Sequence, residues 1–152
     1  GIRDAQESRG LEMCIRDRVK GFIKLKKKEK IKKVILCSGK IYFDLLEARE
    51  KFKRDDLVFY RIEQLYPFPA KALAKELKPY AKKAKFYWCQ EEPKNMGAWF
   101  SARDYIQWTL DNIKANNKKI SYIGRSPDAS PATGYAKRHI SQQQEIIKKV
   151  FE

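Results

Sequence analysis

The chain has 152 residues, of which 43% are hydrophobic, and it carries a formal net charge of +15 at pH 7. This length corresponds to about one domain, and eight tyrosines and eight phenylalanines supply apolar volume for a core. No apolar run approaches the roughly 18 residues that a membrane-spanning helix needs, so we expect a soluble protein. Three widely spaced cysteines without a C-x-x-C pair argue against a disulfide framework or a zinc site and indicate a reducing compartment.

The first 33 residues differ from the rest in charge and in pattern. They hold twelve basic and five acidic side chains, a net charge of +7, with lysines concentrated between Lys24 and Lys33. Such a run is usually a solvated tail or linker. Residues 1–18 show no steady hydrophobic period and no signal-peptide core, and we interpret MCIRDR within them as translated adapter sequence. We therefore expect a leader and basic linker over residues 1–33 and a single domain over residues 34–152.

Strand-like and helix-like patterns alternate from Lys33 onward. A short apolar run over 34–37 predicts a first strand, and apolar residues every three or four positions over 41–52 predict a helix. A second strand is predicted over 57–62. Pro69 suits the first turn of the next helix, whose apolar positions are Leu73, Leu77 and Tyr80.

The second half of the chain continues the alternation. Residues 86–89 predict a third strand, and residues 119–123 predict a weaker fourth one. Between them lies the most regular amphipathic helix, with an apolar face formed by Trp99, Ala102, Ile106, Leu110 and Ile113. A turn-rich loop over 125–133 leads into a final helix from Gly134 onward. The apolar side of that helix is expected to hold Ile140, Ile147 and Val150.

Strands that alternate with helices form βαβ units, which produce a largely parallel sheet with helices on both faces. We therefore predict an α/β fold of three layers, αβα, around a mostly parallel twisted sheet. In such folds ligands and partners gather at the carboxyl ends of the strands. The loops after the first three strands (38–40, 63–68 and 91–97) lie at that predicted edge and carry most of the unusual residues of the chain.

Four stretches occur in an order and spacing that point to a known family. They are LCSGKIYFDLL, RIEQLYPFP, WCQEEPKNMGAW, and GRSPDASPATGY followed by RHISQQQ. Over residues 34–152 they resemble the C-terminal domain of the thiamine-dependent decarboxylating component of 2-oxoglutarate dehydrogenase. The departures are Ser126-Pro127-Asp128 within its loop and Ala136-Lys137-Arg138 before His139, and they affect local contacts only.

The resemblance implies a long homodimeric oxidoreductase of the citric acid cycle, of which this chain is the last domain, with the fold of the transketolase C-terminal domain. Such an oxoglutarate dehydrogenase (succinyl-transferring) decarboxylates 2-oxoglutarate on thiamine diphosphate and passes the succinyl group to a lipoyl-bearing dihydrolipoamide succinyltransferase. Thiamine diphosphate and Mg²⁺ would be held by preceding domains, so we expect the fragment alone to bind neither and to be inactive. The implied location is the bacterial cytoplasm, or the mitochondrial matrix of a eukaryote.

We predict no catalytic, cofactor-binding or metal-ligating residue in this chain. No phosphate-binding G-x-x-x-x-G-K or G-x-G-x-x-G motif occurs, and paired acid–base carboxylates come from separate elements, unlike the neighbours Glu91 and Glu92. We expect one of these glutamates to meet a helix N-terminus or a backbone donor. Asn95 is expected to cap the next helix, Gly97 to allow a close backbone approach, and Trp99 to anchor that helix in the core.

The other candidate residues lie at the same predicted edge or towards the C-terminus. Arg125 could clamp a carboxylate bidentately, or it could tie its loop to Glu91 and Glu92, which is the pairing we expect. Lys40 is a candidate contact for an anionic effector, although its Ser-Gly-Lys turn is too short for a phosphate-binding loop. Structural or interface roles are assigned to Ser130, Gly134 and the single histidine, His139.

Two interpretations of a different class stay open. A free-standing basic module could bind nucleic acid through the lysine run, but this run lacks the interleaved aromatic residues on which bases stack, so nucleic-acid binding is disfavoured. A regulatory domain could instead sense a nucleotide or an acyl-coenzyme A. On every interpretation Cys37 and Cys89, which fall in predicted buried strands, are expected to be inert core thiols.

Overall fold

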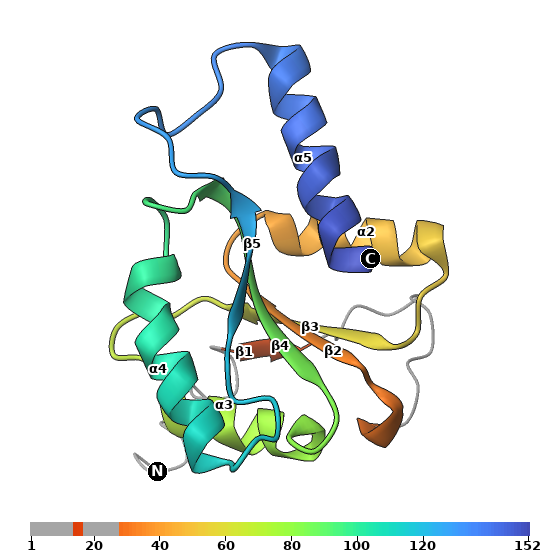
Figure 1. The fold of residues 1–152 in the computed structure, drawn as a ribbon, viewed down its shortest axis with the longest axis vertical. Coiled ribbons are helices and arrows are strands. Elements are labelled where there is room, and N and C mark those ends of the chain that lie inside the picture. Colours follow the sequence, from red (N-terminus) through yellow and green to blue (C-terminus); the bar gives the residue numbers. More distant parts are fainter. Residues whose placement is uncertain (1–13, 17–27) are drawn as a thin grey trace, which may run out of the picture.

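The computed structural model describes residues 14–16 and 28–152, so most of the predicted leader lies outside the described residues. From Lys33 onward, strands and helices alternate as the sequence predicts (Figure 1). In chain order the elements are β1 (Cys14–Arg16), the 3-10 turn η1 (Lys28–Lys30), β2 (Lys33–Cys37), α2 (Ile41–Phe52), β3 (Leu57–Ile62), α3 (Ala70–Leu77), the 3-10 turn η2 (Lys78–Tyr80), β4 (Lys85–Pro93), α4 (Trp99–Asn112), β5 (Ser121–Arg125) and α5 (Ala136–Phe151).

The described strands form one twisted sheet in the order β1-β3-β2-β4-β5 (Figure 1). β3, β2, β4 and β5 are parallel to one another, which confirms the mostly parallel sheet. β1 pairs antiparallel with β3, with Cys14 opposite Ile62 and Arg16 opposite Tyr60. This edge strand lies within the predicted leader, so the sequence analysis missed it. Three residues are too few to show a hydrophobic period.

Helices cover both faces of the sheet, which confirms the three-layer α/β fold (Figure 1). α3 and α4 share one apolar cluster with the sheet, and α2 and α5 share the other. The central strand β2 contributes to both, since Val34 and Leu36 belong to the first cluster and Ile35 and Cys37 to the second. A strand buried on both sides needs a continuous apolar sequence, and these four residues supply it.

α4 follows its predicted register closely. Four of the expected apolar positions are buried, namely Trp99, Ala102, Ile106 and Leu110. The fifth, Ile113, follows the helix and is partly buried. Trp99 is 6% exposed, and its ring lies 5.2 Å from the ring of Tyr122 on β5. The helix carrying Trp99 is therefore anchored directly against the sheet.

The C-terminal elements differ from the prediction in two respects. β5 runs from Ser121 to Arg125, two residues later than expected. On α5 the buried residues are Ile146, Val150 and Phe151, while Ile140 is 55% exposed. The expectation for Ile140 was wrong because the N-terminal half of α5 extends past the carboxyl edge of the sheet (Figure 1), and α5 joins the apolar cluster only from Ile146 onward.

Cys37 and Cys89 occupy paired positions on the adjacent strands β2 and β4, and both side chains are buried. The Cys37 thiol donates a hydrogen bond to the Tyr60 carbonyl (3.8 Å). Burial raises the pKa of the Cys89 thiol to about 12. The reactive form of cysteine is the thiolate, so Cys89 is unreactive near neutral pH. In the part of the chain that the structure describes, none of the helices is both long and apolar enough to span a bilayer.

Candidate functional site at the carboxyl edge of the sheet

β4 extends to Pro93, so Glu91 and Glu92 belong to the end of this strand and not, as predicted, to the loop after it. The segment from Glu91 to Gly97, here called the acidic turn, is organised by the buried side chain of Gln90. Its Oε1 accepts hydrogen bonds from the indole Nε1–H of Trp88 (2.9 Å) and the backbone N–H of Trp99 (3.0 Å). Its Nε2 donates to the carbonyl oxygens of Pro93 (3.1 Å) and Met96 (2.7 Å). Because Trp99 is the first residue of α4, Gln90 satisfies one of the free N–H groups at that helix end.

Gly97 makes room for this amide, and Gly124 makes room for the neighbouring Tyr122 ring. Gly97 has a φ of +66°, and a Cβ there would lie 3.0 Å from Gln90 Nε2 and from Glu92 Oε2. Gly124 on β5 lies opposite a register shift in β4 between Cys89 and Pro93, and a Cβ on Gly124 would collide with the Tyr122 ring. The sequence analysis missed Gly124, although a glycine inside a strand is a known signal of a bulge or a close approach.

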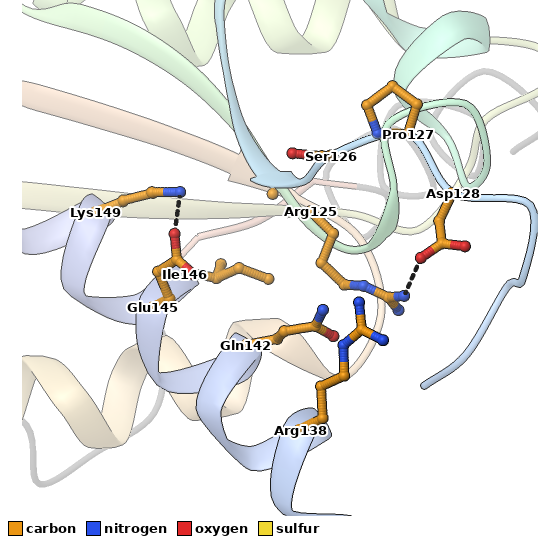
Figure 2. A pocket seen from close by; sticks show the side chains of 10 residues that line it. Arg125, Ser126, Pro127, Asp128, Arg138, Gln142, Glu145, Ile146 and Lys149 are labelled. Carbon is orange, nitrogen blue, oxygen red and sulfur yellow. Dashed lines mark ion pairs between the residues drawn. The ribbon is translucent and has the colours of Figure 1, made fainter. Parts of the chain in front are cut away.

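The Arg125 side chain pairs within its own loop, so the expected pairing with Glu91 and Glu92 was wrong. Only its backbone carbonyl contacts the acidic turn, where it accepts a hydrogen bond from the Lys94 N–H (3.1 Å). Its Nη2 lies 3.9 Å from Asp128 Oδ2 (Figure 2), and its Nη1 donates to the Pro131 carbonyl (3.4 Å). Asp128 is three residues further along the same loop, so this pairing restricts less of the chain than one between two strands. Arg125 therefore shapes its own loop.

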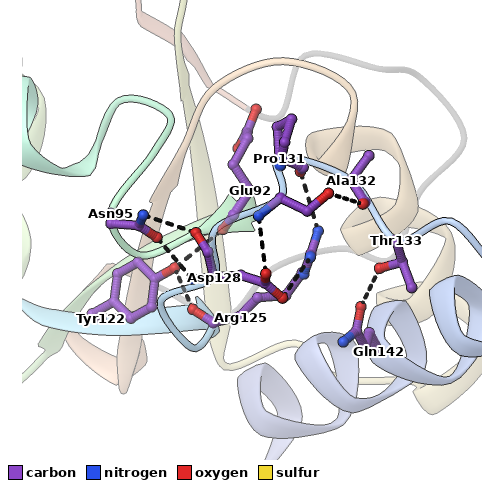
Figure 3. Close-up of polar contacts among 10 residues, drawn as sticks. Glu92, Asn95, Tyr122, Arg125, Asp128, Pro131, Ala132, Thr133 and Gln142 are labelled. Atoms are coloured by element: carbon purple, nitrogen blue, oxygen red, sulfur yellow. Dashed lines mark hydrogen bonds and ion pairs between the residues drawn. The ribbon is translucent and has the colours of Figure 1, made fainter.

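Asn95 links the acidic turn to that loop and does not cap α4. Its Nδ2 donates to the Asp128 carbonyl (2.9 Å), and its Oδ1 accepts from the Asp128 N–H (3.0 Å), as Figure 3 shows. The N-cap position of α4 belongs to Ala98, which offers no capping side chain. The Tyr122 hydroxyl strengthens the junction, since it lies 3.3 Å from the Glu92 carbonyl and 3.1 Å from the Arg125 carbonyl.

A second set of polar contacts, here called the edge cluster, consists of Lys40, Asp44, Glu91 and Gln143. Gln143 Nε2 donates to Asp44 Oδ2 (2.8 Å) and to Glu91 Oε1 (3.0 Å). Lys40 Nζ donates to the same two oxygens at 3.1 and 3.4 Å. The hydrogen bond to Asp44 is the main reason that the pKa of Lys40 is raised. Two carboxylates thus already balance Lys40, which argues against its role in binding an anionic effector.

The remaining candidates lie on the exposed side of the loop and of α5. The Ser130 N–H donates to Asp128 Oδ1 (3.0 Å), and its Oγ donates to the Ala132 carbonyl (2.8 Å) (Figure 3). These bonds hold the loop in shape, in keeping with a structural role. Gly134 and His139 are exposed, and the backbone N–H of His139 donates to the Tyr135 carbonyl (3.0 Å). Their assignment to an interface stays a prediction.

The described residues do not fit a site for magnesium and a diphosphate. Mg²⁺ is held by carboxylate and other oxygen ligands, and within residues 28–152 no group of three or more His, Cys, Asp or Glu side chains is placed to hold a metal ion. Three carboxylates at the carboxyl edge, those of Asp44, Glu91 and Asp128, are instead engaged by Lys40, Gln143 and Arg125. No step of thiamine chemistry can be assigned to these residues.

The fold defines the class of protein as a three-layer α/β domain with a largely parallel central sheet. At the carboxyl edge of this sheet, polar side chains hydrogen-bond to one another and to the backbone. The family described as 2-oxoglutarate dehydrogenase C-terminal matches residues 2–151, and the chain belongs to this family. The match confirms the resemblance carried by the four sequence motifs. It also extends into the predicted leader, whose boundary at residue 33 stays a prediction.

Relatives of known sequence agree with this assignment. The 2-oxoglutarate dehydrogenase E1 components of Brucella anthropi and Brucella ovis are each 53% identical over 120 residues. The alignment covers 79% of this chain and only 12% of either relative, so the chain spans a small part of their length. A split gene transketolase, described as an inactive beta4 tetramer, has a TM-score of 0.49 at 10% identity, over 81% of this chain and 39% of that one.

Proposed function

We propose that the chain completes a 2-oxoglutarate dehydrogenase E1 component as its C-terminal structural and dimerisation domain. The observation that carries the proposal is the family match over residues 2–151. The site geometry supports it, because Lys40, Asp44, Glu91, Asn95 and Gln143 form structural contacts with other residues of this chain. Neither nucleic-acid binding nor acyl-coenzyme A sensing gains support from the comparisons.

In this proposal the complete enzyme is an oxidoreductase that decarboxylates 2-oxoglutarate and transfers the succinyl group to lipoyl. Thiamine diphosphate and Mg²⁺ are held by domains outside this chain. The partners are a second copy of the enzyme and a lipoyl-bearing dihydrolipoamide succinyltransferase. The support is the name of the relatives, 2-oxoglutarate dehydrogenase E1 component, at 53% identity. Those relatives are bacterial, which favours the cytoplasm over the mitochondrial matrix.

A domain exchange tests the proposal. Residues 34–152 would replace the matching C-terminal segment of the Brucella anthropi E1 component, and dehydrogenase activity and dimer mass would be measured. We expect the chimera to be a dimer that retains activity, whereas the relative without its last segment loses both. In parallel, calorimetry with thiamine diphosphate and Mg²⁺ on the 152-residue chain should show no binding. An active relative lacking the segment, or micromolar cofactor binding by the chain, would contradict the proposal.

A charge reversal provides a sharper test of the structural role. Glu91→Lys places a positive charge beside Lys40 and removes an acceptor of Gln143, so it should weaken the edge cluster without touching a reacting atom. In the chimera we expect less dimer at equal concentration, with activity per dimer preserved. Glu47→Lys, an equal charge change on the exposed side of α2, serves as the control. Full dimerisation of Glu91→Lys would argue against an assembly role for this edge.

A further inference from the structure

A pocket of about 290 Å³ opens between the loop after β5 and the outer face of α5 (Figure 2). This volume is close to the lower limit of small-molecule sites, roughly 300 Å³. The pocket is separate from the edge cluster and from the Gln90 turn. Its lining consists of Gly124–Asp128, Arg138, Gln142, Glu145, Ile146 and Lys149.

The charged side chains of the pocket leave one cation without a partner. Lys149 pairs with Glu145 at 2.6 Å. Arg125 and Asp128 form only a long pair, 3.9 Å between Nη2 and Oδ2. Among the residues that the structure describes, Arg138 forms no ion pair. One loosely held carboxylate, Asp128, therefore faces two guanidinium groups.

The guanidinium groups of Arg125 and Arg138 both influence the Asp128 carboxylate. The Ser130 N–H is the main reason that the pKa of Asp128 is lowered, and the charges of Arg125 and Arg138 lower it further. Figure 2 shows both arginine side chains directed into the space beside Gln142. Two like charges that converge on an open pocket repel each other, so an added anion would relieve a repulsion as well as form new hydrogen bonds.

Gln142 adds a neutral donor with a defined orientation. Thr133 Oγ1 donates to Gln142 Oε1 (2.6 Å), which turns the amide so that Nε2 is its free end. No acceptor for this Nε2 is found within the described part of the chain. Gln142 lies on α5 and lines the pocket, whereas Thr133 lies on the loop before α5 (Figure 3). The site therefore offers two guanidinium groups and one oriented amide donor.

We propose that this pocket binds the phosphoryl group of a small phosphate ester. Guanidinium forks match phosphate oxygens bidentately, and a dianionic group balances two arginines where a single carboxylate cannot. The pocket volume leaves room for a body of a few carbon atoms beside the phosphoryl group. Arg138 is the principal charge partner, Arg125 and Gln142 Nε2 complete the donors, and Asp128 competes with the ligand for Arg125. The site stands on this pocket alone and does not depend on the proposed function.

Titration calorimetry on the whole 152-residue chain, in a phosphate-free buffer at low salt, tests the site with glycerol 3-phosphate and inorganic phosphate as probes. We expect both to bind, with the ester tighter if the pocket holds its carbon body, and acetate to bind far more weakly. Arg138→Gln should weaken binding about tenfold, the effect expected for loss of one charged hydrogen bond. Asp128→Asn should strengthen binding, because it removes the competing carboxylate.

Lys137→Gln is the matched control, since Lys137 precedes Arg138 in the exposed first turn of α5 and does not line the pocket. It should change affinity less than twofold. Both substitutions are at exposed positions, and circular dichroism would verify that the fold is kept. Equal losses in Arg138→Gln and Lys137→Gln would show that the +15 chain attracts anions without a site, and the proposal would be overturned. Absence of phosphate and ester binding by the parent chain would overturn it as well.

Discussion

Gln90 shows how a single neutral side chain can determine the shape of an acidic turn. It is 1% exposed, and its amide bonds join the end of β4, the turn and the start of α4. Its position in the sequence does not indicate this role, because a glutamine at the end of an apolar run can point either into the core or into solvent. A clue does exist in the two flanking tryptophans, since a buried indole N–H usually needs an acceptor.

Gln90→Ala should therefore be strongly destabilising. The substitution leaves the Trp88 indole and the Trp99 backbone N–H without their acceptor, and two carbonyls without their donor. Each buried group left unpaired costs about 1–3 kcal/mol, so we expect a loss of at least 3 kcal/mol in the free energy of unfolding. Gln144→Ala, at an exposed position of α5, should stay within about 0.5 kcal/mol. Chemical denaturation of both variants measures the difference, and equal stabilities would refute the role given to Gln90.

The raised pKa of Cys89 leads to a prediction about protein stability at alkaline pH. Burial raises its pKa from an ordinary 9.0 to about 12 in the folded chain. The contribution of this thiol to stability is therefore complete below pH 9, and it is lost as the pH rises from 9 to 12, because the unfolded chain releases the proton first. Cys89→Ala lacks this proton, so its stability should fall less steeply than that of the parent over that range. Parallel pH profiles of the two proteins, measured by urea denaturation, would contradict this expectation.

At the scale of elements, α4 and α5 contrast. α4 has buried side chains from Trp99 to Leu110, whereas α5 buries side chains only at Ile146, Val150 and Phe151. Few buried apolar contacts mean that a segment opens locally at low cost. In the first half of α5, side-chain hydrogen bonds connect Gln142 to Thr133 and Gln143 to Asp44.

Hydrogen exchange should resolve this contrast. We expect amide protons of residues 140–144 to exchange at least tenfold faster than those of residues 148–151, because the second group is tied to buried side chains. In α4 the protection should be similar along residues 103–110, which serves as the internal control. Exchange measured by NMR or mass spectrometry checks the prediction. Uniform protection along α5 would mean that its first half is held by contacts other than those described.

For the whole molecule, the sequence predicts the parts that depend on periodicity and misses those that depend on loops meeting in space. The apolar strand 34–37 and the register of α4 follow from local spacing, and both are found as expected. Asn95 was assigned to a helix cap, but its partner Asp128 lies 33 residues away. Ile140 has suitable helical spacing, yet the sheet ends before reaching it. In both cases the deciding fact is the three-dimensional position of another segment.

β1 leads to a prediction about truncation. The described members of both apolar clusters all lie beyond residue 18, so after removal of residues 1–18 the melting temperature should change by only a few degrees. However, the removal also leaves the outer edge of β3 unpaired, and an open strand edge promotes association. We expect the truncated chain to be folded by circular dichroism but to self-associate more than the parent in light scattering at high concentration. A loss of the cooperative unfolding transition would show that β1 is part of the core.

The double hydrogen bond between Asn95 and Asp128 has a mechanical consequence. A side-chain amide that exchanges both a donor and an acceptor with one backbone unit imitates a rung of a β-ladder. The loop after β5 and the turn after β4 are therefore expected to move together. The irregularity of β4 opposite Gly124 separates them from the regular part of the sheet. We therefore expect a displacement of the loop after β5 to be felt at the start of α4 through Asn95 and the Gln90 amide.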